Sequence, residues 1–475
     1  MNAKLSSWLK KEIRPLRKRS APSPLARKVG RVFQILILLA LCTFALWRIL
    51  LYRDIAQQFA RIQLAGLPTS GTELNAWRHP LPDAENGALV LTQAFALVRT
   101  FSDSRSNEVV EPKILARTNV WASATRALVE AYVQTNQPAL AKVHEGLLLP
   151  GFRYPVDLSY GPETELPHLG GLKVMARIAA LQTALEAEGG HEDEWPEHVA
   201  LQLTLARTLD DEPTVISHLV RNAILRMAVK ATERSLNRVT PSNEMCKRLQ
   251  DAFTRVGETN LLPLAFVGER AMMIPTFRLS WKEIQSFSQG DEEKSQHRKP
   301  QQYSGKPALF LWLSGFLERD LNFFLETMQT SASFAALPAP QNLALTNYLE
   351  SAIKISNKRT YLLSGLLLPS YSRIVVREAS TRSLIDLATT ALAVERFRHQ
   401  RGRLPTTLAE LTPELLEKVP WDPFDGTPLR YRVLAKGYVI YSVDVDGHDD
   451  GGREAPERKK LADNGLYDIT FIVER

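Results

Sequence analysis

Residues 32–52 read VFQILILLALCTFALWRILLY, an apolar run with Gln34 and Arg48 near its ends. A helix needs about 20 mainly apolar residues to cross the hydrocarbon core of a bilayer. Arg48 can extend toward the interface, and Trp47 and Tyr52 suit the aromatic belt at its edge. No small-residue cleavage site follows, which favours an uncleaved anchor over a signal peptide. We therefore predict one transmembrane helix; the alternative is a buried helix of a soluble protein.

The segment before this run, residues 1–31, accounts for the positive charge of the chain. It contributes +9 to a total of +7, so the remaining residues carry −2. A basic flank stays in the cytoplasm and lies against anionic lipid headgroups, which places the body outside the cytoplasm. The sequence therefore predicts a single-pass protein of the inner (cytoplasmic) membrane whose bulk is periplasmic. No nucleic-acid partner is expected, because the basic excess belongs to the tail alone.

The two cysteines point to no covalent framework. Cys42 lies inside the predicted span and Cys246 lies alone in the predicted outer body. They cannot pair across that arrangement, so we expect neither a disulfide nor a cysteine metal site.

Residues 53–375 carry mainly helical patterns. Apolar residues recur at helical spacing over 174–185, 199–209 and 216–227, with breaks at Gly189–Gly190 and at residues 210–213. Short breaks indicate antiparallel helical hairpins. The turn over 184–195 resembles that of a tetratricopeptide helix pair, without a sustained repeat. We predict an α-helical body whose surface could bind a partner protein.

Three further segments differ from this helical pattern in composition. Residues 285–307 are polar and charge-mixed, which predicts a surface loop with a lid as the alternative. The apolar runs 308–316 and 361–368 are too short to span a bilayer and favour buried helices. Pro369 is expected to end the second of them.

The sequence pattern changes in residues 376–475, where helix and strand signals both occur. This pattern predicts a small α+β module. A long helix is expected over 377–399, and Thr407–Glu410 has the pattern of a capping box that starts a short helix. Strands are expected at 429–434, 438–443 and 467–473. The fold class is therefore mainly α, ending in a helix followed by a small antiparallel sheet.

An acidic loop follows the second expected strand. Asp444, Asp446, Asp449 and Asp450 alternate with glycines, and calcium takes six to eight oxygens at about 2.3–2.6 Å in such turning loops. The twelfth position from Asp444 is Ala455 where an EF-hand carries glutamate, so this is not an EF-hand. The spacing is equally compatible with a solvated acidic loop.

Several motifs appear in a fixed order through this module: FRHQRGRLP at 397–405, VPWDPFDGTPLRY at 419–431, DGHDDGG at 446–452 and Asp468-Ile469. Together they resemble the C-terminal part of the major pseudopilin of type II secretion systems. The resemblance covers about a fifth of the chain and implies a helix running into a sheet, with a C-terminal loop that holds calcium.

Carried over residue by residue, the resemblance implies calcium ligands in this chain. Asp446 and Asp468 match the aspartates of the family's calcium loop, and Val443 would offer a backbone carbonyl. Asp449 and Asp450 are further candidates with less certain counterparts. The segment between residues 452 and 468 is longer here than in the family.

The start of the chain departs from the pseudopilin pattern. Pseudopilins carry a glutamate at the fifth position of the apolar helix, whereas Ile35 stands five residues after Gly30, and more than 300 residues separate anchor and module here. We therefore expect no assembly into a pseudopilus. The whole chain also resembles uncharacterised single-pass membrane proteins of planctomycete and verrucomicrobial lineages, which implies a domain layout and no activity.

The sequence offers little that indicates catalysis. It has no nucleophile elbow, phosphate-binding loop, dinucleotide-binding loop or zinc-protease motif. His191 and His198 lie seven apart but Pro196 interrupts them, and Asp83 with Glu85 suits the start of a helix. We favour a non-enzymatic binding or structural protein with a calcium-stabilised module. The alternatives are a component of a type II secretion or pilus-like system, and an envelope hydrolase with its site in the helical body.

Overall fold

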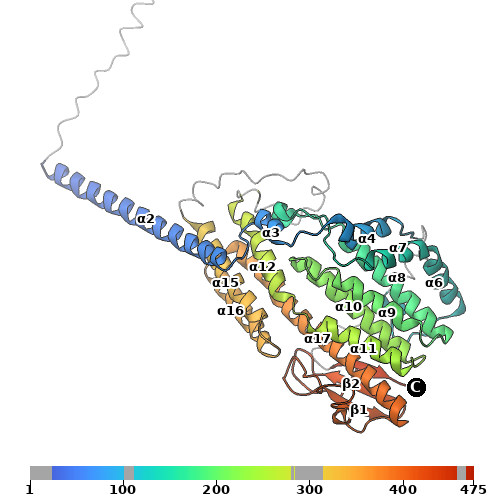
Figure 1. The fold of residues 1–475 in the computed structure, drawn as a ribbon. Coiled ribbons are helices and arrows are strands. Elements are labelled where there is room, and N and C mark those ends of the chain that lie inside the picture. The colour runs from blue at the N-terminus through green and yellow to red at the C-terminus, as the bar shows by residue number, and fades with distance from the viewer. Residues whose placement is uncertain (1–23, 101–111, 280–282, 284–313, 457–466) are drawn as a thin grey trace, which may run out of the picture. The chain divides into compact units, whose positions relative to one another are not determined.

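The computed structural model describes residues 24–100, 112–279, 283, 314–456 and 467–475 (Figure 1). The chain divides into two compact units, residues 1–56 and residues 57–475. The predicted loop at 285–307 and most of the tail at 1–31 lie outside the described residues, as does nearly all of the apolar run at 308–316.

Helix α2, Pro24–Leu64, contains the apolar run. Among the described residues it is the one helix long and apolar enough to cross a membrane. Its apolar side chains between residues 29 and 46 are largely exposed, as a lipid-facing surface would be. The helix therefore fits the span of a single-pass membrane protein, and its length and position also fit a signal sequence.

The second unit is predominantly helical, as predicted. Short 3-10 turns lie between some of its α-helices. The helices are α3 (Gly71–Trp77), α4 (Gly87–Ala96), α6 (Ser123–Thr135), α7 (Gln137–Leu147), α8 (His168–Gly189), α9 (Trp195–Arg207), α10 (Val215–Leu236), α11 (Asn243–Glu258), α12 (Leu262–Met273), α15 (Phe316–Ala335), α16 (Ala344–Lys358) and α17 (Leu362–Arg401). The 3-10 turns are η1 (Asp83–Glu85), η2 (Pro112–Leu115), η3 (Leu158–Glu163), η4 (Ile274–Arg278), η6 (Gln341–Leu343) and η7 (Leu408–Leu411).

The three predicted stripes correspond to α8, α9 and α10, which pack against one another (Figure 1). Gly190 ends α8 in the left-handed conformation, at φ 79°, where residues other than glycine are strained. Thr214 begins α10 by accepting a hydrogen bond from the Ser217 backbone N–H. Ile178 and Leu181 of α8 and Val199 of α9 are fully buried, so the helical period predicted the core faces of these two helices correctly. In α10 the predicted stripe lies on the wrong face, because Ile216 is 57% exposed whereas Leu225 and Val229 are buried.

Helix α17 corrects one expectation. Pro369 lies inside this 40-residue helix and does not end it. Asp320 of α15 accepts hydrogen bonds from the backbone N–H groups of Leu363 (2.8 Å) and Ser364 (3.2 Å), which satisfies donors at the start of α17. Leu363 and Tyr371 are buried on either side of the proline. Packing thus outweighs the roughly 3 kcal/mol that an interior proline costs.

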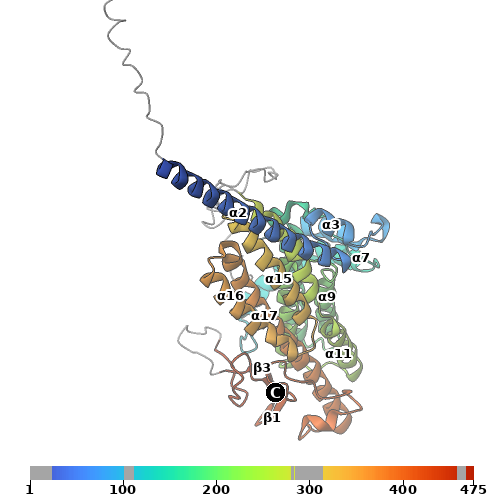
Figure 2. The same cartoon turned by 90° about the vertical axis from the view of Figure 1, so that its left-hand side faces the viewer.

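Helices α15, α16 and α17 lie side by side (Figure 2). The predicted boundary between body and module, at residue 375/376, falls in the middle of α17, which continues without a break. The C-terminal half of α17 contacts α10, α11 and the sheet. One hydrophobic core runs from Ala88 through the helices to Val473, so body and module share it.

The sheet is antiparallel, in the order β1 (Arg430–Leu434), β2 (Gly437–Ser442) and β3 (Ile469–Val473). This confirms the predicted strands to within two residues at each end. Its inner face, including Tyr438 and Phe471, packs on α17. A 3-10 turn, η1, begins at Asp83 as expected, and Asn86 caps the α-helix that follows, α4. The capping box shifts by one residue, because Glu410 accepts hydrogen bonds from the backbone N–H and the hydroxyl of Thr406 instead of Thr407.

Candidate functional site

Asp422 lies in the segment between η7 and β1, and its side chain is fully buried. It bonds both this segment and the end of β2. Its Oδ1 accepts hydrogen bonds from the Ser442 hydroxyl (2.9 Å) and the Phe424 backbone N–H (3.0 Å). Its Oδ2 accepts from the Val443 backbone N–H (2.9 Å) and the Arg430 guanidinium (3.1 Å). Asp422 therefore fixes the end of β2, where the acidic loop begins.

The acidic loop starts with a tight turn that leaves Asp446 in solvent. Asp444 adopts φ 59°, a left-handed conformation that aspartate tolerates better than most residues. Asp446 is exposed, and its Oδ1 accepts a hydrogen bond from the His448 backbone N–H at 3.1 Å. The buried Val443 uses its N–H on Asp422.

Asp449 faces a cation of the protein itself. Its Oδ2 lies 3.0 Å from the Arg430 Nε, and its Oδ1 accepts from the Gly451 backbone N–H at 2.9 Å. Burial tends to raise the pKa of Asp449, but the Gly451 N–H and the Arg430 charge lower it below its usual value. The Arg430 guanidinium and the Gly451 N–H therefore stabilise the ionised form of Asp449.

Asp450 and Asp468 form the buried part of the loop. Asp468 is 3% exposed; its Oδ2 accepts from the Gly452 backbone N–H at 2.7 Å, and its Oδ1 receives a weak contact from the Asp450 N–H at 3.4 Å. The Asp450 Oδ2 is buried and has no partner among the described residues. Burial first, and then the charges of Asp449 and Asp450, raise the pKa of Asp468.

The structure thus gathers three of the five predicted metal residues, Asp449, Asp450 and Asp468, at one turn, and leaves Asp446 at the exposed end. Within the described part of the chain, their ligand oxygens do not form a group of three within 4.8 Å of one another. A calcium ion would have to draw them closer. Their role as calcium ligands stays a prediction.

A different group of acids and histidine does converge, at the end of α8. Glu186, His191 and Glu194 bring one ligand atom each within 4.8 Å of one another. His191 Nδ1 lies 2.5 Å from the Glu186 Oε2 and 3.8 Å from the Glu194 Oε2. His198, the second histidine of the sequence motif, is not a member. His191 and Glu194 are more than half exposed, so the group is an ordinary surface ion pair.

A large cleft, which the sequence did not predict, lies among α10, α11 and α17. It has a volume of about 750 Å³, within the range typical of ligand sites. The loops 337–342 and 415–423 complete its wall. Its ionisable lining residues are Arg221, Glu258, Glu378, Arg382, Asp386, Glu417 and Lys418.

A polar network crosses the wall of this cleft. The Glu378 Oε2 of α17 accepts hydrogen bonds from the His218 Nε2 (2.8 Å) and the Asn222 Nδ2 (2.7 Å), both on α10. His218 and Asn222 stand one helical turn apart in an otherwise apolar stripe, and that polar pair was the available sequence signal. Burial tends to raise the pKa of Glu378, but His218, Asn222 and Arg221 lower it to about 2.

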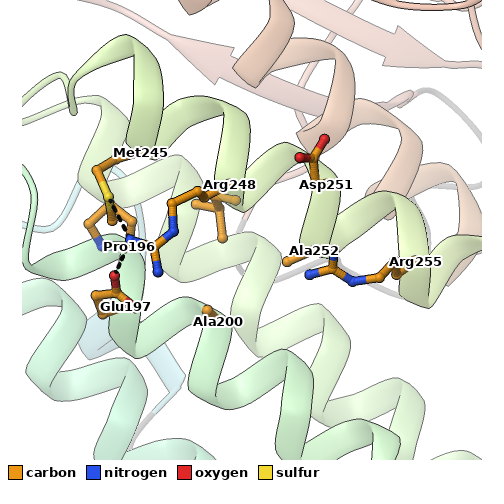
Figure 3. Close-up of a pocket in the computed structure, with 9 residues that line it drawn as sticks. Pro196, Glu197, Ala200, Met245, Arg248, Asp251, Ala252 and Arg255 are labelled. Carbon is orange, nitrogen blue, oxygen red and sulfur yellow. Dashed lines mark hydrogen bonds and ion pairs between the residues drawn. The ribbon is translucent and has the colours of Figure 1, made fainter.

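A second, smaller hollow lies between α9 and α11 (Figure 3). It measures about 300 Å³ and has Ala200 and Ala252 along it. Arg248 spans it, pairing with Glu197 at 2.9 Å and contacting the Met245 sulfur at 3.4 Å. Since Arg248 is already paired with Glu197 and Asp251 with Lys247, we assign this groove no chemistry.

Comparison with known proteins adds one partial similarity. No family model matches the chain, and no solved structure matches it. Two proteins from strains of Mycobacterium tuberculosis, both described as Rieske 2Fe-2S iron-sulfur proteins, are 31% identical over 96 residues. The match covers 20% of this chain and 17% of each relative, so the chain spans about a sixth of their length.

The cysteines of this chain do not fit a Rieske cluster. Such a centre holds its irons with two cysteine thiolates and two histidines. The chain has two cysteines, Cys42 in the apolar helix of the first unit and Cys246 in the second. Cys246 is fully buried, its Sγ contacts the Pro241 carbonyl at 3.7 Å, and burial raises its pKa to about 12. A thiol held protonated in this way is a poor metal ligand.

Proposed function

We propose that the chain is a membrane-anchored extracytoplasmic protein with a binding or structural role, whose C-terminal module is stabilised by calcium. The observation that carries this proposal is the acidic turn formed by Asp449, Asp450 and Asp468. The Asp450 Oδ2 has no partner in the described structure, and the charges of Asp449 and Asp450 oppose ionisation of Asp468. A bound cation would satisfy that oxygen and offset the repulsion.

Calcium binding is tested by measuring the thermal stability of the full-length protein in detergent. We expect the melting temperature to rise in calcium relative to chelator, because a ligand that binds only the folded state stabilises it, by about 2.7 kcal/mol at 100 times its Kd. Magnesium should give a smaller rise, since it requires a tighter octahedral site. Asp450→Asn should abolish the calcium shift.

The matched control is Asp251→Asn, which removes a half-exposed carboxylate on α11 that pairs with Lys247. This variant should keep the full calcium shift. Identical melting of the wild-type protein in calcium and in chelator would remove the metal from the proposal.

The anchored, extracytoplasmic topology rests on α2 and on the basic residues before it. An alkaline phosphatase fused to the C-terminus should be active, because this enzyme matures only outside the cytoplasm. The fusion should also stay in the membrane fraction with its N-terminus intact. Release of a shortened soluble protein would instead identify α2 as a cleaved signal sequence.

A role in a type II secretion or pilus-like system is the alternative. It is supported by the packing of an antiparallel sheet on the C-terminal half of α17, an arrangement compatible with the pseudopilin resemblance. Crosslinking in intact cells followed by purification of this chain should then recover pseudopilins. Their consistent absence would leave the binding or structural role.

A further inference from the structure

The cleft among α10, α11 and α17 contains one partly buried carboxylate, Glu378, that forms no ion pair with an arginine or lysine among the described residues. Glu378 uses its Oε2 for the two hydrogen bonds from α10, and its Oε1 has no hydrogen-bond partner among the described residues. The side chain is 19% exposed, so this oxygen is not sealed inside the core. Asn222 beside it also keeps its Oδ1 without a described donor.

The histidine that contacts Glu378 offsets its charge only when the imidazole is protonated. His218 is buried, and its other ring nitrogen, Nδ1, has no partner among the described residues. A protonated imidazole would leave a buried N–H donor unsatisfied there, which is costly. The neutral tautomer, donating from Nε2 to the carboxylate, leaves only an unpaired acceptor. With His218 in this neutral form, Glu378 keeps a negative charge that the histidine does not offset.

The arginines near Glu378 are committed to other acids. The Arg221 Nε lies 2.8 Å from the Asp210 Oδ1, and the Arg382 Nε lies 2.9 Å from the Asp386 Oδ2. The remaining charged groups of the wall, all exposed, are two acids and one base: Glu258, Glu417 and Lys418. The cleft is thus negative overall, and Glu378 is its partly buried carboxylate without an arginine or lysine partner among the described residues.

The rest of the cleft wall is mainly apolar and could contact the apolar part of a ligand. Val256, Ile385, Leu415 and Leu416 line the cleft, and Trp421 lies at it with more than half of its surface exposed. Ligand sites commonly combine such walls with a few convergent polar groups, and an aromatic face attracts a cation. We propose that this cleft binds a small organic cation, a protonated amine on an apolar body, with the ammonium against the Glu378 Oε1.

This proposal is independent of the calcium site and of the membrane topology. It is tested by titrating the full-length protein with phenethylamine and with 2-phenylethanol, a neutral analogue of nearly the same shape, by calorimetry. We expect saturable binding of the amine and binding of the alcohol weaker by about tenfold or more, the usual size of a hydrogen bond to a charged group. Glu378→Gln should weaken amine binding by a similar factor.

Glu417→Gln is the matched control, because it removes the same charge from an exposed position of the same wall. It should leave amine binding within about twofold, since exposed charges are screened by solvent. Circular dichroism and melting temperature establish that Glu378→Gln is folded. Equal binding of amine and alcohol, unchanged binding in Glu378→Gln, or no saturable amine binding by the wild type up to about 10 mM, in the weak range of affinities, would overturn the proposal.

Discussion

The Glu233 Oε1 of α10 accepts a hydrogen bond from the backbone N–H of Ile472 in β3, at 2.8 Å. One turn further along α10, the Asn237 side chain donates to the Ile472 carbonyl and accepts from the Glu474 N–H, both at 2.7 Å. Two helical side chains thus bond the edge of β3 that faces away from β2. They protect an edge strand from foreign pairing and join the module to the helical body.

Glu233→Gln should change how stability depends on pH. Burial is the main cause that raises the pKa of Glu233, to about 7 from an ordinary 4.5. Between these values the unfolded chain releases a proton that the folded chain keeps, so this group lowers the free energy of unfolding as pH rises. Glutamine keeps the acceptor for Ile472 and removes the ionisation. Chemical denaturation should show equal stability near pH 4.5 and a more stable variant at pH 8; parallel curves would contradict the assignment.

Asn237→Ala should lower the free energy of unfolding by about 1–3 kcal/mol, because the Ile472 carbonyl and the Glu474 N–H each lose a partner. Urea titration measures the loss. Asn347→Ala, at an exposed position of α16, is the control and should stay within about 0.5 kcal/mol of the wild type. If both variants changed the free energy of unfolding equally, the contacts of Asn237 with β3 would make no net contribution to stability.

Asp422→Asn should destabilise the module strongly. Both carboxylate oxygens of Asp422 accept two hydrogen bonds each, so an amide group would point its N–H donors at other donors. We expect a loss of about 3 kcal/mol, as for breaking a buried charged interaction. Hydrogen exchange should show faster exchange of the Val443 amide than of the α8 amides. Uniform exchange would instead indicate that the module unfolds only with the whole protein.

Gly268→Ala tests how closely α12 approaches the chain before α10. A β-carbon at Gly268 would lie 1.6 Å from the Pro213 carbonyl oxygen, so the backbone must move. We expect a loss of about 3 kcal/mol or more in the free energy of unfolding. Gly170→Ala in α8 meets nothing within 4 Å and should be neutral or stabilising by up to about 1 kcal/mol. Similar stability of the two variants would contradict the packing described for α12.

Local patterns predicted much of this fold because they depend on short-range geometry. The stripes at 174–185 and 216–227 became α8 and α10, and the expected strands became β1, β2 and β3. Pro369 was misread because its local cost is outweighed by contacts from α15 and by burial around Tyr371. That compensation comes from residues far away in the sequence, so no local pattern contains it.

The cleft could not be predicted either, because it is formed by residues far apart in the sequence. His218 and Glu378 are 160 residues apart, and only the packing of α10 on α17 brings their side chains to 2.8 Å. The acidic turn was visible in the sequence, yet the sequence did not show that Arg430 engages Asp449 or that Asp450 keeps an unpartnered oxygen.

By itself, the sequence determined the apolar helix, the helical class of the body, the three strands and the position of the acidic turn, because periodicity and composition act over neighbouring residues. Only the tertiary structure decided that α17 continues past Pro369 and that α10 bonds the free edge of β3. It alone also placed Glu378 in a cleft where, among the described residues, no arginine or lysine pairs with it. Burial and long-range pairing set the electrostatic environment of a side chain, and neither is encoded in the residues beside it.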